Sequence, residues 1–103
     1  MGIEAVWRDE QGVELGRVSD PKMILSRLTN ITSGFSHTAC LRFLDPYGDA
    51  CFNQLQLPIL AEELRVTASM EAEPAVSQHL QELLALVERA TNQVHTYLWF
   101  IGD

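Results

Sequence analysis

The chain of 103 residues lacks a long apolar run, a lysine-rich segment and a recognisable catalytic motif. Its longest notable apolar run, residues 97–101, is far shorter than the about 18 residues that a membrane span needs. Lys22 is the only lysine, and 14 acidic residues against 7 basic ones give a net charge of -7. Because this balance repels phosphate backbones and anionic lipids, we expect no nucleic acid and no membrane as partner.

Metal-binding and catalytic patterns are also missing. His37 and Cys40 are a single close pair of ligand types, whereas zinc sites use two such pairs, so we expect no metal and no cofactor. No G-x-S-x-G, glycine-rich phosphate loop or H-E-x-x-H occurs. His79 and Glu82, three apart on a predicted helix, are typical of a solvated surface pair. We therefore expect no catalytic residue, and a small enzyme using Cys40, Cys51 or a histidine is the last alternative.

The two cysteines, Cys40 and Cys51, are too few for a disulfide framework. In the register expected below they lie four positions apart, roughly 13 Å, whereas a disulfide needs Cα atoms within about 7 Å. The chain begins without a basic region followed by an apolar stretch, so we expect no secretory signal. Reduced thiols and the missing signal favour a cytoplasmic location.

The N-terminal third of the chain predicts a hairpin followed by a helix. Residues 3–8 and 13–18 are rich in strand formers, and Gly12 can adopt the positive φ that a short hairpin loop needs. Asp20 can accept hydrogen bonds from the free N–H groups of a helix that begins at Pro21. The helix is expected to bury Ile24, Leu28 and Ile31 and to end over residues 30–34.

The central part predicts a second hairpin and two helices. Residues 39–44 and 50–57 flank a turn at 45–49, and apolar groups on both faces favour a place near the centre of the sheet, with Leu44 opposite Cys51. A helix that begins at Pro58 is expected to bury Ile59, Leu60, Leu64 and Ala68. The clearest helix begins at residue 74 or 75 and is expected to bury Val76, Leu80, Leu83, Leu84, Val87 and Thr91.

The last segment is compatible with two structures. Residues 94–101 are rich in β-branched and aromatic residues, which favours a strand. Val94, Leu98 and Ile101 also continue the preceding helical stripe, but a helix over residues 75–101 would be unusually long for so small a domain. We therefore expect a final strand.

Together these elements predict an α+β fold in two layers. An antiparallel sheet of four to five strands is covered on one face by helices, in the order ββαββααβ. The whole chain, residues 1–103, is expected to be a single domain, because its length is too short for two.

Two groups of side chains are candidates for a binding site. The turn at 45–49 brings two carboxylates and a phenol together, where they can meet an arginine or lysine of a partner, although Asp, Pro and Gly are also what a turn alone needs. In the final strand, His95, Tyr97 and Trp99 share one side, and the residues between them share the other. One set must face the helices, and the other lies on an open face unless the chain covers both. The candidate binding residues are Asp45, Tyr47, Asp49, His95, Tyr97 and Trp99.

An acidic chain without catalytic motifs favours a binding role. We expect a small module that binds another, basic protein, as an inhibitor, an immunity-type neutraliser or an adaptor does. Acidic residues over 61–89 can steer such a partner, although they are also typical of a solvated face. The alternative is a homo-oligomer, in the simplest case a homodimer, that pairs the aromatic faces and holds a small ligand between its subunits.

Overall fold

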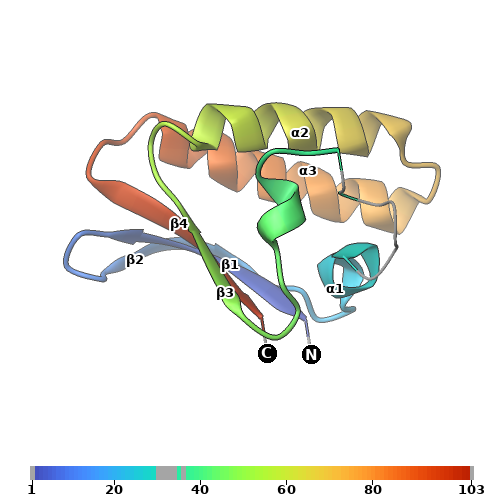
Figure 1. Cartoon of the computed structure of the whole chain (residues 1–103), viewed down its shortest axis with the longest axis horizontal. Helices are drawn as coiled ribbons and strands as arrows, with labels where there is room; N and C mark the ends of the chain where they lie inside the picture. The colour runs from blue at the N-terminus through green and yellow to red at the C-terminus, as the bar shows by residue number, and fades with distance from the viewer. Residues whose placement is uncertain (1, 30–34, 36, 103) are drawn as a thin grey trace.

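The computed structural model of the chain describes residues 2–29, 35 and 37–102 (Figure 1). Within these residues, no helix is both long and apolar enough to cross a membrane. In chain order the elements are β1 (Ile3–Asp9), β2 (Glu14–Val18), α1 (Ile24–Thr29), the 3-10 helix η1 (Leu41–Phe43), β3 (Asp49–Phe52), α2 (Leu57–Met70), α3 (Pro74–Thr91) and β4 (Thr96–Gly102).

The four strands form one antiparallel sheet in the order β2-β1-β4-β3. The first and last strands are the central pair, joined from Ile3 opposite Gly102 to Asp9 opposite Thr96. The predicted fold class is confirmed, with four strands, and the predicted order of elements matches except that the segment expected as the third strand is η1. The expected final strand is also confirmed as β4, which begins two residues later than predicted.

The helices pack on one face of this sheet and make the core with it. Figure 1 shows α2 and α3 side by side above the strands. From the sheet, every second residue of the central strands is buried beneath them, among them Trp7 and Phe100, and the Phe52 ring meets the Phe100 ring edge to face at 5.8 Å. From α2 and α3 the buried stripes include Leu57, Leu60, Leu64, Ala68, Val76, Leu80, Leu83 and Val87.

The first hairpin forms as predicted. Gly12 has a φ of 83°, and the Asp9 carboxylate closes the turn by accepting hydrogen bonds from the N–H groups of Gln11 and Val13. The helix after it begins at Ile24 rather than at Pro21, because residues 21 and 22 form a turn and Met23 adopts a positive φ of 55°. In its expected stripe, Ile24 is buried and Leu28 partly buried; Ile31 and the predicted helix end over 30–34 lie outside the described residues.

The second predicted hairpin is wrong. Residues 41–43 form η1 instead of a strand, because the Glu63 carboxylate of α2 accepts hydrogen bonds from the N–H groups of Ala39, Cys40 and Leu41 at 2.6 to 3.0 Å. Donors held in this way are not free for a strand ladder. Consequently β3 pairs with β4 and lies at the edge of the sheet, not near its centre, and Leu44 does not face Cys51.

Two boundaries around α2 also differ from the prediction. The strand expected over residues 50–57 stops at Phe52, because the Asn53 side chain accepts hydrogen bonds from the N–H groups of Leu55 and Gln56 and turns the chain into α2. Ile59, expected in the core, is 48 % exposed. By contrast, α3 begins at Pro74 as predicted.

Candidate functional site

The last strand, β4, turns its two sides to different surroundings. Leu98 and Phe100 are fully buried against the helices, so the alternating residues Tyr97, Trp99 and Ile101 face away from them. This settles which of the two sets predicted from the sequence lies on the uncovered side. We call this side the open face of the sheet; its apolar members are Val6, Cys51, Tyr97, Trp99 and Ile101.

Strand register places an apolar residue on each side of Trp99. Its partners on the neighbouring strands are Val6 of β1 and Cys51 of β3. Val6 is fully buried and offers no accessible surface, whereas Cys51 is exposed. The accessible apolar surface of the open face therefore lies over β4 and β3, and sequence reasoning had assigned it to β4 alone.

The aromatic residues of the open face are partly accessible. Tyr97 is 36 % exposed, Trp99 and Ile101 are half-buried, and Cys51 is exposed. The Arg8 guanidinium lies 5.8 Å from the centre of the Trp99 ring, a cation–π contact that covers part of the indole. In the sequence, Val6 and Arg8 alternate with the buried residues of β1, and this alternation indicates that they lie on the open face.

The acidic turn meets one end of the open face. Asp49 is the cross-strand partner of Ile101, and the Gly102 N–H donates to the Gly48 carbonyl at 2.8 Å. Tyr47 is 84 % exposed, and the Asp45 carboxylate accepts a hydrogen bond from its N–H at 2.9 Å, as expected of turn chemistry. The acidic turn and the aromatic residues of β4, which sequence analysis gave as two separate candidate groups, therefore lie side by side in the structure.

His95 lies at the opposite end and is not part of the strand. It has a φ of 61° and precedes β4, so it does not share the ladder row of Tyr97 as predicted. Its Nδ1 lies 2.7 Å from Glu10 Oε1 of the β1–β2 loop, and both side chains are exposed. His95 therefore contacts that loop, 85 residues away in sequence, and does not continue the strand.

Some charged side chains around the open face form ion pairs within the chain, and others do not. Arg17 of β2 contacts Glu4 at 3.2 Å and Glu14 at 2.9 Å, and the hydrogen bond between Arg17 and Glu14 lowers the pKa of Glu14. At the other edge, no cation of the described chain pairs with Asp45 or Asp49. The acidic turn therefore carries carboxylates that remain available to a partner.

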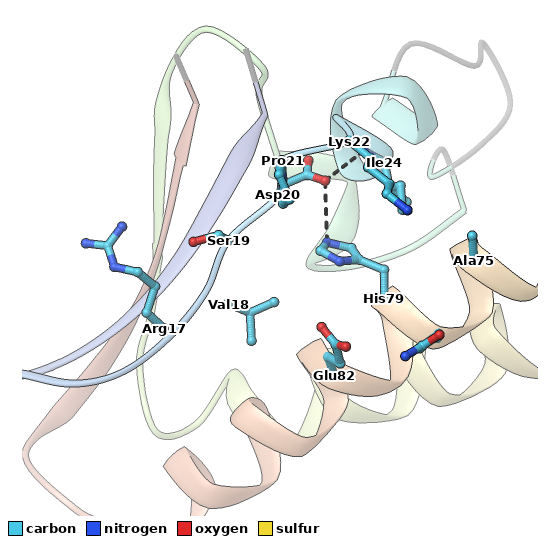
Figure 2. Close-up of a pocket in the computed structure, with 11 residues that line it drawn as sticks. Arg17, Val18, Ser19, Asp20, Pro21, Lys22, Ile24, Ala75, His79 and Glu82 are labelled. Atoms are coloured by element: carbon cyan, nitrogen blue, oxygen red, sulfur yellow. Dashed lines mark hydrogen bonds and ion pairs between the residues drawn. The ribbon is translucent and has the colours of Figure 1, made fainter.

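A separate pocket opens between the β2–α1 loop and the first turns of α3 (Figure 2). Asp20 and His79 lie at its base, with His79 Nε2 3.5 Å from Asp20 Oδ1 and both side chains buried. The Asp20 carboxylate also accepts hydrogen bonds from the N–H groups of Ile3, Ile24 and Leu25 at 2.7 to 3.1 Å. It therefore links β1 to α1 and lies beside α3, which extends the capping role predicted for it.

The prediction that His79 is a solvated surface residue is wrong. Its side chain is 8 % exposed, and Glu82 beside it is exposed. The signal was present in the sequence, because His79 stands three residues after Val76 and four before Leu83, on the buried stripe of α3. Its partner Asp20, 59 residues earlier, has no such local signal.

The cysteines remain separate thiols. Cys40 is buried, Cys51 is exposed, and both are free. Burial and the nearby Glu63 carboxylate raise the pKa of Cys40, and partial desolvation raises that of Cys51, which disfavours the nucleophilic thiolate. Nowhere in residues 2–29, 35 and 37–102 do three or more His, Cys, Asp or Glu gather as a metal site.

Because comparison with known proteins found no match, the fold and the site are interpreted from their geometry alone. The chain matches no protein-family model, no curated protein and no solved structure.

Proposed function

We propose that this chain is a non-catalytic module that binds another protein, one with a basic contact surface, through the open face of its sheet. The observation that carries the proposal is the accessible apolar surface over β4 and β3, with Tyr97 and Trp99 at its centre and the acidic turn at its end. We place the module in the cytoplasm, where its two free thiols stay reduced.

The residue types on the open face support a protein partner. Tyr, Trp and Arg carry much of the binding energy in protein interfaces, and Tyr97, Trp99 and Arg8 lie next to one another here. Contiguous apolar surfaces rimmed by polar groups are typical of interaction sites. The carboxylates of Glu4 and Asp49 border this surface, as the polar rim of an interface does.

Charge favours a basic partner over a second copy of the chain. Two copies, each with a net charge of -7, repel one another, whereas a basic surface is attracted over a distance of about 10 Å at moderate salt. Asp45 and Asp49 have no intramolecular cation in the described chain, so pairing with a partner's arginine or lysine breaks no existing ion pair.

Site-specific photo-crosslinking tests the proposal. A benzophenone amino acid replaces Tyr97, and a matched control replaces Met70, which is 79 % exposed on α2. In lysate, we expect position 97 alone to form a covalent adduct. The adduct should be with a polypeptide other than this chain, its cross-linked segment should be basic, and its yield should decrease at high salt. The partner is then purified and its affinity measured against Trp99→Ala, which should weaken binding about thirtyfold, and against Met70→Ala, which should not.

Two results would contradict the proposal. Equal adducts from positions 97 and 70 would show that the open face has no specific partner. An adduct with a second copy of this chain, together with a dimer mass in light scattering, would favour the homo-oligomer instead. Circular dichroism of Trp99→Ala serves as the folding control, because the indole is only half-buried and its loss should leave the fold intact.

A further inference from the structure

The pocket beside Asp20 and His79 is large enough for a small molecule. Its volume is about 440 Å³, within the range of ligand-binding clefts. One wall is the β2–α1 loop with Lys22, and the other is α3 with Ala75 and Glu82, as Figure 2 shows. Of the residues that line the pocket, Arg17 of β2 also borders the open face, where it contacts Glu4, and the other lining residues lie away from that face.

Most charged groups at the pocket already have partners. The Asp20 carboxylate is buried and accepts three backbone hydrogen bonds, and Arg17 is held by two glutamates. Lys22 and Glu82 remain, both exposed and without an ion-pair partner in the described chain. The pocket therefore offers one available cation and one available anion.

The N-terminus of α3 adds hydrogen-bond donors at one end of the pocket. Pro74 occupies the first turn and no side chain caps it, so the N–H groups of Ala75 and Val76 lack intrahelical acceptors. In Figure 2, Lys22 and Ala75 lie toward the same end of the pocket. A carboxylate placed there would meet an ammonium group and the positive end of the helix.

An unsatisfied buried atom also points to a missing ligand. His79 Nε2 is buried without a hydrogen-bond partner, since its 3.5 Å approach to Asp20 Oδ1 is too long. Native buried polar atoms without partners are few, and a ligand in the pocket would lie beside this one. Val18, Pro21 and Ile24 add apolar surface to the walls, and Ser19 and Gln78 add uncharged polar groups.

We propose that this pocket binds a free α-amino acid with an apolar side chain. The carboxylate lies at Lys22 and the N-terminus of α3, the ammonium group pairs with Glu82, and the side chain packs on Val18 and Ile24. A simple anion would leave Glu82 repelled, and a simple cation would leave Lys22 repelled. Only a zwitterion satisfies both charges at once.

Calorimetric titration tests this site with leucine, valine and methionine as probes. The matched probes for leucine are 4-methylpentanoate, which lacks the ammonium group, and 3-methylbutylamine, which lacks the carboxylate. We expect leucine to bind at least about tenfold more tightly than either analogue, because each analogue loses one charged hydrogen bond. Lys22→Gln and Glu82→Gln should each weaken leucine binding by a similar factor.

Control variants and a spectroscopic signal complete the test. Arg27→Gln on α1 and Glu88→Gln on α3 remove the same charges outside the pocket and should leave leucine affinity unchanged. Leucine should also shift the imidazole nitrogen resonances of His79 and not those of His95. No binding of the three amino acids up to about 10 mM would overturn the proposal, as would equal affinity for leucine and its analogues, or unchanged affinity in the Lys22 and Glu82 variants.

Discussion

Replacement of Asp20 by alanine should remove a large part of the stability of this domain. Its carboxylate accepts hydrogen bonds from the N–H groups of Ile3, Ile24 and Leu25, three residues that are at most 5 % exposed. Each buried donor left without an acceptor costs about 1–3 kcal/mol. Because the adjacent pocket lets water reach part of the vacated space, we expect a loss near the lower end of the sum, about 3–5 kcal/mol, out of a typical total of about 5–15.

Urea unfolding followed by circular dichroism measures this loss at neutral pH as a change in the free energy of unfolding. Asp9→Ala is the matched control, because the Asp9 carboxylate also accepts two backbone N–H groups, but at an exposed turn where water can replace it. That variant should lose only about 0.5–1.5 kcal/mol. If the two variants lost the same amount, the buried hydrogen bonds to Asp20 would not hold β1 and α1 together as argued.

Two further changes probe the edge of the sheet and the acidic turn. With iodoacetamide at pH 8, exposed Cys51 should react faster than buried Cys40. Because the pKa of each thiol is raised, both should react more slowly than an ordinary thiol, and both rates should increase with pH. Mass spectrometry measures the two rates, and equal rates would refute the burial argument. Gly102→Ala should cost about 1–3 kcal/mol in urea unfolding, since its new Cβ would lie 2.0 Å from the Asp45 carbonyl oxygen, and an unchanged midpoint would show that the turn does not pack there.

Local patterns predicted the elements, and long-range contacts decided how they join. The β-branched and aromatic content of residues 94–101 predicted the final strand, and proline at residue 74 marked the start of α3. Residues 39–44 looked equally suited to a strand. Their helical turn depends on the Glu63 carboxylate, 22 to 24 residues away, which no local pattern reveals.

The candidate site was predictable only in part. Alternation identified Tyr97 and Trp99 as one side of a strand, but the proximity of the Asp45–Asp49 turn follows from the pairing of β3 with β4, which the sequence did not predict. The pocket was missed altogether. Its base joins Asp20 and His79 from distant parts of the chain, whereas the sequence predicted a helix cap for Asp20 and a surface pair with Glu82 for His79.

The pairing of β1 with β4 has a consequence for how this protein is made. During translation β1 leaves the ribosome first, yet the strand that completes it lies 87 residues later at Asp9 and 99 residues later at Ile3. Until residues 96–102 have emerged, the apolar side of β1 has no central neighbour, and the nascent chain cannot close its sheet. Folding of this domain therefore waits for its last strand, and a ribosome stalled before residue 96 should present an incompletely folded chain to chaperones and proteases.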